Sequence, residues 1–252
     1  VYLDQEKRWW KPSAADHFYD REVTALCSDP QRAAVWIGTY DFGLFRYDLV
    51  KDTFAYYDSQ PRDEHQLHSS LIFDLAKDRN GNIWVATNSG GLSRFTYGNE
   101  TKPFWNYNLT SGLPENTILA VQCDEKNRLW LLTYKSLTCM SDTGKVIRKY
   151  PFDPGFGNSD FGVLTSMTPD GEILIPVKNG FIQFHPDRLE PEPYSFPVVI
   201  RNILVNGNEI DWDGEREFAF PYHQNNIEIS FSALNYSRPA EISFEYKLEG
   251  AD

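Results

Sequence analysis

The chain has 252 residues, of which 41% are hydrophobic and 15% aromatic, so it can bury a substantial core in one large domain or two small ones. Its formal net charge of −12 disfavours direct contact with nucleic acid or with an anionic membrane surface, because both select basic faces. The 16 glycines and 15 prolines are scattered, which favours many short strands joined by turns over a helical bundle.

Two absences set the broad class. No apolar run approaches the ~18 residues that a membrane-spanning helix needs. The chain begins at Val1 without an initiator Met or a targeting signal, which indicates a piece of a longer protein. Its three cysteines, Cys27, Cys123 and Cys139, are odd in number and far apart, so we expect buried free thiols and no disulfide framework or zinc site.

The strongest pattern is an internal repeat in the first three quarters of the chain. Each unit places an apolar strand, a turn, a strand centred on a large apolar residue, a short loop and a further strand in the same order. The central residues are Trp36, Trp84, Trp130 and, in a weaker fourth unit, Leu174. They are 48 (36 to 84), 46 (84 to 130) and 44 (130 to 174) residues apart. A period in the mid-forties with short strands is typical of β-propeller blades.

The parts of each unit follow from alternation and turn chemistry. Val23–Ser28 is the expected innermost strand of the first unit, and the tryptophans are expected to fill the space between blades. Asn-Gly and Asp-Gly sequences predict tight hairpin turns at 79–82 and 169–172. The expected outer strands are aromatic: 54–57, 104–107, 146–150 and, for a preceding blade, 8–10.

The chain changes character after residue 189. A proline-rich linker at 190–197 is followed by alternating segments that do not continue the repeat. The expected strands are Val198–Val205, Glu217–Phe220, Asn226–Leu234 and Ile242–Leu248, with a turn at Asn206-Gly207. In Ile227–Phe231 every second residue is apolar, which predicts a half-buried strand. These segments indicate the start of an antiparallel sandwich.

Two motifs resemble a known family. The segments 80–87 and 91–95 resemble the two-component regulator propeller repeat, and 232–239 with 244–252 resemble the triple-tyrosine (YYY) domain. Together they resemble the periplasmic sensor region of hybrid two-component proteins from gut Bacteroidetes. The resemblance implies an all-β chain: propeller blades over 1–189, about four in number and part of a larger propeller, the linker 190–197, and an incomplete immunoglobulin-like sandwich over 198–252.

The resemblance also implies a function. Such regions are periplasmic, sense glycan-derived oligosaccharides, form homodimers through the sandwich, and relay a signal to a membrane-anchored histidine kinase or regulator that controls transcription. No catalytic residue, metal or cofactor is expected in this segment. The chain departs from the pattern at Ser136, where other units have Gly, at Pro176 in the fourth unit, and at Phe244, where the tail prefers Tyr.

The resemblance and the loop chemistry predict one ligand face. In a propeller the second-to-third-strand loops and the outer-to-inner loops share one end of the blades. The longer outer-to-inner loops are Ser59–Ser70, Asn108–Asn116 and Asp153–Asp160. Aromatic, amide and charged side chains suit sugar C–H patches and hydroxyls. The candidate ligand residues are Tyr40, Asp41, Phe42, Asn88, Ser89, Tyr134, Lys135, Lys178 and Asn179.

Other readings stay open at this stage. Each of these loops can be an ordinary polar turn. His65 and His68 could bind a metal or act as a general base, although a solvated loop is the simpler reading. Asp78–Asn82 is similar to a calcium loop but lacks its full ligand pattern, so a hairpin turn is expected. The functional alternatives are a carbohydrate-active propeller enzyme (a lyase or glycosidase) and a protein-binding scaffold.

Overall fold

The computed structural model describes residues 2–3, 9–10, 21–99, 101–152, 165–189, 198–212 and 217–233. The chain divides into two compact units, Val1–Leu189 and Glu190–Asp252. Four predicted features lie outside the described residues: the loop Asp153–Asp160, the linker 190–197, the strand Ile242–Leu248 and most of the tail motif.

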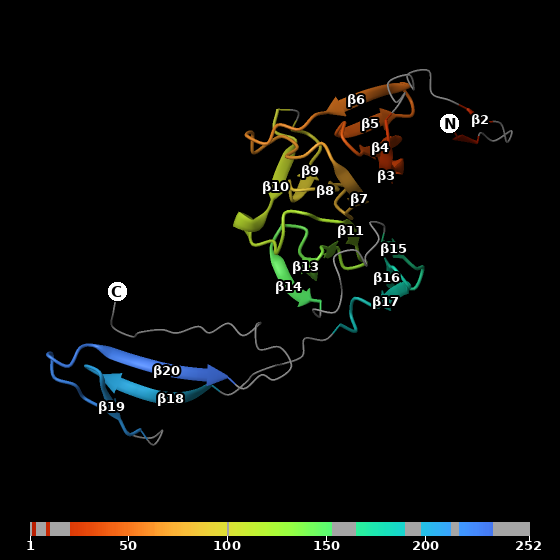
Figure 1. Cartoon of the computed structure of the whole chain (residues 1–252). Helices are drawn as coiled ribbons and strands as arrows, with labels where there is room; N and C mark the ends of the chain where they lie inside the picture. The colour runs from red at the N-terminus through yellow and green to blue at the C-terminus, as the bar shows by residue number, and fades with distance from the viewer. Residues whose placement is uncertain are drawn as a thin grey trace. The chain divides into compact units, whose positions relative to one another are not determined.

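The first unit is built from successive antiparallel sheets (Figure 1). Blade 1 contains β3 (Val23–Asp29), β4 (Ala34–Thr39), β5 (Leu44–Asp48) and β6 (Thr53–Tyr57); blade 2 contains β7 (Ile72–Lys77), β8 (Ile83–Thr87), β9 (Leu92–Phe95) and β10 (Phe104–Tyr107); blade 3 contains β11 (Ala120–Cys123), β12 (Leu129–Leu132), β13 (Ser136–Met140) and β14 (Val146–Pro151). Short 3-10 turns, Pro30–Arg32 and Leu109–Ser111, interrupt two connections. Within each blade the strands pair in chain order, which confirms the predicted four-strand unit.

Two smaller sheets complete the described part of this unit. Blade 4 has three strands, β15 (Ser166–Met167), β16 (Ile173–Val177) and β17 (Gly180–Phe184). Pro176 is tolerated in β16 because β15 pairs only with Ile173 and Leu174, so the missing N–H of Pro176 removes no bond to β15. At the start of the chain, β1 (Tyr2–Leu3) pairs with β2 (Trp9–Trp10).

The repeated tryptophans lie between neighbouring blades, as predicted. Trp36 and Trp84 are fully buried and Trp130 is 2% exposed. Trp36 packs in a cluster with Leu75 and Phe104 of blade 2, and the cluster around Trp130 includes residues of blade 4. The cluster around Trp84 draws on blade 3 through Val121, Cys123, Leu129, Leu131 and Met140. The aromatic excess of the composition is therefore partly the apolar filling between blades.

Two of the repeated tryptophans between blades, Trp84 and Trp130, each donate a hydrogen bond to a buried carboxylate. The indole Nε1 of Trp84 donates to Asp78 Oδ2 at 2.9 Å, and that of Trp130 donates to Asp124 Oδ2 at 2.9 Å. Asp78 also accepts the backbone N–H of Asn82 at 2.8 Å, so Asp78–Asn82 is the predicted hairpin turn. Among the described residues no group of three or more His, Cys, Asp or Glu side chains could hold a metal ion.

Blade 1 reaches the same arrangement through its neighbour. Trp36 Nε1 donates to the hydroxyl of Tyr97 at 3.0 Å, and that hydroxyl donates to Asp29 Oδ2 at 2.9 Å. Lys77, also from blade 2, pairs with Asp29 at 2.7 Å, and Arg32 does so at 3.1 Å. Burial opposes ionisation of Asp29, but these three donors outweigh it and hold the pKa of the carboxyl below its usual range.

The three cysteines are free thiols. Cys123 and Cys139 are buried as predicted, whereas Cys27 is only half-buried. Burial raises the pKa of Cys27 and Cys139 to about 11 and that of Cys123 to about 12. All three therefore stay protonated and weakly nucleophilic near neutral pH.

The second unit contains a three-stranded antiparallel sheet in the order β19–β18–β20. Its strands are β18 (Val198–Val205), β19 (Asn208–Ile210) and β20 (Ile227–Ala233). The predicted turn at Asn206-Gly207 is confirmed, with φ of 50° and 81°. The predicted strand Glu217–Phe220 is wrong: these residues have no strand structure. Four alternating residues form a strand only beside a sheet edge, and no described strand pairs with them.

On one face of this sheet the apolar side chains of β20 are exposed, whereas Ile203 and Val205 of β18 on the same face are buried. Ile227 and Ile229 of β20 lie opposite Val205 and Ile203 of β18, so their side chains share a face. Ile227, Ile229 and Phe231 are 46%, 48% and 39% exposed. The strand predicted at Ile227–Phe231 is confirmed by β20, but its predicted half-burial is wrong for the described residues, because none of them covers these three side chains.

Candidate ligand-binding site

The loops predicted to face a ligand are interlaced with the connections between blades. The loop after β8 donates from Asn88 N to Leu71 O at 3.0 Å and accepts from Ser69 Oγ at 2.8 Å. On its other side Gly91 N donates to Asn116 O at 2.8 Å. The second-to-third-strand loop of blade 2 thus lies beside both neighbouring outer-to-inner connections, which places these loops at one end of the blades.

A threonine closes each of these loops. Thr39 Oγ1 donates to Gly43 O at 2.7 Å and Thr87 Oγ1 donates to Gly91 O at 2.8 Å, and both glycines have positive φ. In blade 3 Thr133 Oγ1 donates to Ser136 O at 3.1 Å across a loop one residue shorter. Ser136 is not among the residues with positive φ. The shorter loop explains why serine can replace glycine there.

The blade 1 loop is the most exposed aromatic part of this face. Tyr40 is 49% exposed and Phe42 37% exposed, and Asp41 between them is also exposed. The guanidinium of Arg21 lies 4.5 Å from the centre of the Phe42 ring, which fixes one face of that ring. This loop therefore presents aromatic surface and hydrogen-bonding groups together.

In blades 2 and 3 part of the predicted set is already engaged. Asn88 is half-buried and its Oδ1 accepts from Thr117 Oγ1 at 3.4 Å, whereas Ser89 is exposed. Lys135 is exposed and lies 3.7 Å from Glu115, and its backbone N–H donates to the same carboxylate at 3.0 Å. Tyr134 packs partly against the buried cluster around Trp130. Asn88 and Tyr134 are therefore partly held by neighbouring residues, whereas Ser89 and Lys135 are exposed.

The remaining candidates differ in kind. Lys178 and Asn179 are the two exposed residues of a tight turn, because Val177 pairs with Gly180. His68 Nε2 lies 3.2 Å from the carbonyl of Asp63. Both histidines are half-buried and His65 packs against the Trp105 ring, so the loop is partly packed and differs from the solvated loop expected.

The innermost strands β3, β7 and β11, together with Thr165 just before β15, line a cavity that the sequence did not predict. This axial pocket has a volume of about 390 Å³, within the range of small-molecule sites. It is lined by Val23, Thr24, Ala25, Leu26, Asp74, Leu75, Val121, Gln122 and Thr165. The predicted loop residues are not in its lining.

Asp74 is the only ionisable side chain in that lining. Its Oδ1 accepts Leu75 N at 2.8 Å, and its Oδ2 accepts Val121 N of blade 3 at 2.9 Å. Burial raises its pKa to about 7 despite both hydrogen bonds. Asp74 of blade 2 has the same strand register as Ala25 of blade 1 and Ala120 of blade 3. The sequence signal that could have identified it is a carboxyl where the other two blades have alanine.

The lining also holds hydroxyl groups that have no hydrogen-bond partner among the described residues. Thr24 Oγ1 and Thr165 Oγ1 are buried and have no partner within the described part of the chain. Gln122 Nε2 donates to Cys123 O at 3.3 Å, which leaves the amide oxygen of Gln122 without a bond that the structure assigns. Buried hydroxyls without partners are uncommon in native proteins, which favours binding of a polar ligand in this pocket.

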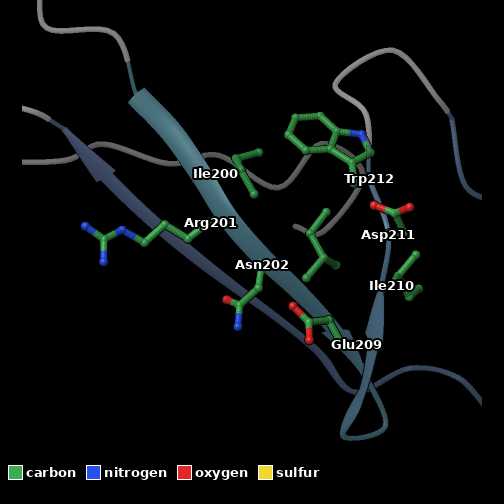
Figure 2. Close-up of a pocket in the computed structure, with 8 residues that line it drawn as sticks. Ile200, Arg201, Asn202, Glu209, Ile210, Asp211 and Trp212 are labelled. Atoms are coloured by element: carbon green, nitrogen blue, oxygen red, sulfur yellow. The ribbon is translucent and has the colours of Figure 1, made fainter.

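The second unit has a cavity of its own, of about 340 Å³ (Figure 2). The indole of Trp212 lies beside Ile200, while Arg201 and Asn202 extend away from them (Figure 2). Asn202 Oδ1 is buried without a partner among the described residues, and Arg201 Nε donates to Ser232 Oγ at 3.1 Å.

Two segments of the chain match a family model. Residues 66–89 and 112–135 match the model described as two component regulator propeller. The chain is also similar to "Histidine kinase P4" of Formosa agariphila, with 37% identity over 276 aligned positions that cover 86% of this chain. That alignment covers 20% of the relative, so the chain spans about a fifth of its length.

Solved structures are similar at the level of the fold. The β-propeller domain of Cps50 (Swd1) of Myceliophteria thermophila has a TM-score of 0.51 at 10% identity, over 68% of this chain and 54% of that one. Virginiamycin B lyase of Staphylococcus aureus has a TM-score of 0.50 at 17% identity, over 72% and 60%. The extracellular domain of the protein designated hybrid two component system BT3049 of B. thetaiotaomicron scores 0.48 at 20% identity, over 87% and 36%.

No helix among the described residues is both long and apolar enough to cross a membrane. Taken with the sheets, the wedge tryptophans and the matched segments, these likenesses establish a β-propeller architecture for the blades of the first unit, with segments of the two component regulator propeller type.

Proposed function

We propose that this chain is the extracytoplasmic ligand-sensing region of a two-component signalling protein. The observation that carries the proposal is the match of two blades to the two component regulator propeller model. The 37% identity to a protein named as a histidine kinase supports it. On this proposal the chain lies in the periplasm, the full protein is anchored in the membrane, and ligand binding changes the output of a kinase or regulator that controls transcription.

The ligand we propose is a glycan-derived oligosaccharide bound at the loop face. Tyr40 and Phe42 supply exposed rings that can stack on sugar C–H patches. Asp41, Ser89, Lys135, Lys178 and Asn179 are exposed around the same end of the blades and can bond hydroxyls. The fixed Asn88 and Tyr134 would supply the rigid part of such a site.

The variants Tyr40→Ala and Phe42→Ala are expected to weaken binding of the recognised oligosaccharide about 2- to 10-fold each, as loss of one aromatic contact implies. Calorimetry with a panel of oligosaccharides on the 252-residue chain measures this. Tyr56→Ala is the matched control, because Tyr56 is 50% exposed on outer strand β6. Absence of binding by every oligosaccharide in the panel would refute the proposal.

We also propose that the chain forms a homodimer through the second unit. The exposed apolar face of β20 supports this, since solvated patches of this kind mark association sites. Ile229→Asp is expected to shift the dimer to monomer in light scattering at high concentration. Glu228→Lys, on the opposite face of the same strand, is the control. A purely monomeric wild-type chain would contradict the proposal.

The alternative function is a carbohydrate lyase or glycosidase, because virginiamycin B lyase has a similar fold and one fold can carry different functions. Product analysis after incubation with the same panel separates the two, because turnover of a bound sugar would replace the sensor proposal with the enzyme. Binding of a protein partner with no sugar binding would favour a scaffold.

A further inference from the structure

The axial pocket contains a carboxyl group without a counter-charge. Of its nine lining residues only Asp74 is ionisable, and neither Lys, Arg nor His is among them. The partners assigned to Asp74 are the two backbone N–H groups of Leu75 and Val121. Asp74 is half-buried, and a carboxylate partly withdrawn from water is normally paired with a cation or given further donors, which the lining does not supply.

The strands packed around Asp74 supply no cation. On β7 itself, Lys77 is engaged with Asp29 at 2.7 Å. On β3 the nearest titratable group is the Cys27 thiol, whose pKa burial raises to about 11, so it is neutral near pH 7. On β11 the thiol of Cys123 is neutral for the same reason, and β8 contributes no titratable side chain. β4, which also packs on β7, has no titratable side chain. A cation that pairs with ionised Asp74 would therefore come from outside these described strands.

We propose that the axial pocket binds a small ligand carrying a protonated amine, with Asp74 as its counter-charge. An ammonium group offers three donors, which matches the Asp74 carboxylate together with the unbonded hydroxyl oxygens of Thr24 and Thr165. The amide oxygen of Gln122 can accept a hydroxyl of the same ligand. A ligand with negative charge is rejected, because the lone charge of the pocket has the same sign.

This site is separate from the proposed oligosaccharide face, whose loop residues do not line the pocket. It adds a second ligand class, and it can fail or succeed independently of the oligosaccharide proposal. The pKa of Asp74 near 7 supports this proposal. A cation bound beside the carboxylate would offset the desolvation that disfavours its ionised form.

Three probes with the same six-carbon hydroxylated chain test the proposal: 1-amino-1-deoxysorbitol, sorbitol and gluconate, which are cationic, neutral and anionic near pH 7. Calorimetry on the 252-residue chain at pH 8 is expected to rank the amine at least about 10-fold tighter than sorbitol, with no gluconate binding. Equal binding of sorbitol and the amine would overturn the amine assignment and point to a neutral polyol site.

The Asp74→Asn variant is expected to lose the preference for the amine, whereas Asp170→Asn, in an exposed turn outside the pocket, is expected to keep it. A second measurement does not need the variant to fold. With a pKa of about 7, Asp74 is mostly neutral at pH 6, so the amine should bind the wild-type chain about 10-fold more weakly at pH 6 than at pH 8. A pH-independent affinity, or an unchanged preference in Asp74→Asn, would refute the proposal even if oligosaccharides bind the loop face.

Discussion

Replacing Trp84 with alanine is expected to lower the free energy of unfolding by about 3–5 kcal/mol. Trp84 is fully buried, and its ring lies in the cluster between blades 2 and 3 with Val121, Leu129 and Leu131. Its removal leaves a cavity at the wedge between two sheets. It also removes the indole donor of Asp78, a 3% exposed carboxylate.

Denaturant unfolding followed by circular dichroism measures this loss. Trp105→Ala is the matched control, because Trp105 is 48% exposed on outer strand β10, and its loss is expected to cost under about 1 kcal/mol. Trp84→Phe should fall between the two, since it keeps most of the apolar volume but loses the bond to Asp78. Similar losses for Trp84→Ala and Trp105→Ala would contradict the wedge role.

The substitution Gly91→Ala is expected to destabilise the chain by about 3–4 kcal/mol. Gly91 has φ of +81°, and a Cβ built on it would lie 2.0 Å from the backbone oxygen of Tyr107. Relief requires the backbone of β10 or of the loop to move, and that loop is fixed by the bonds from Thr87 Oγ1 and to Asn116 O. Backbone strain and a steric clash therefore add at one position.

Gly98→Ala separates these two causes. Gly98 has φ of +88°, yet a Cβ there would meet no atom within 4 Å. This variant should lose only about 1 kcal/mol, the cost of the left-handed conformation alone. Thermal unfolding of both variants measures the difference. If Gly91→Ala were no worse than Gly98→Ala, the close approach of β10 to this loop would be wrong.

The repeat made most of the blade architecture predictable. The spacing of Trp36, Trp84 and Trp130 placed three sheets, and strand edges differ from the expected ones by about one residue. Alternation in a long segment such as Val198–Val205 also identified a strand with its observed bounds. It failed at Glu217–Phe220, because four alternating residues carry no information about whether a neighbouring strand edge is free.

Side-chain pairing between blades could not be predicted from spacing. Tyr97 lies just beyond β9, and nothing near it in the sequence indicates that its hydroxyl joins Asp29 and Trp36, more than sixty residues earlier. The position of Asp74 at the pocket could not be predicted either, because it depends on the strand register. Its strand reads as an apolar inner strand, and only alignment with Ala25 and Ala120 reveals that a carboxyl replaces a small apolar side chain at the axis.

The loop residues were the part of the candidate site that could be predicted best from the sequence. The residues after β4, β8 and β12 follow directly from the repeat, so their shared position at one end of the blades was expected. The partial burial of Asn88 and Tyr134 was not, because it depends on contacts with the connections between blades. Whether a ligand uses this face is a separate question that binding experiments answer.

The bond from Trp36 to Tyr97 has a consequence for how the propeller comes apart. In blades 2 and 3 the indole of Trp84 or Trp130 donates to a carboxylate of the same blade, so this hydrogen bond can form once that blade has folded. In blade 1 the indole and the carboxylate are joined only through a tyrosine of the next sheet. We therefore expect blades 1 and 2 to unfold together. Tyr97 bridges Asp29 and Trp36, which are one residue further apart in the sequence than Asp78 and Trp84.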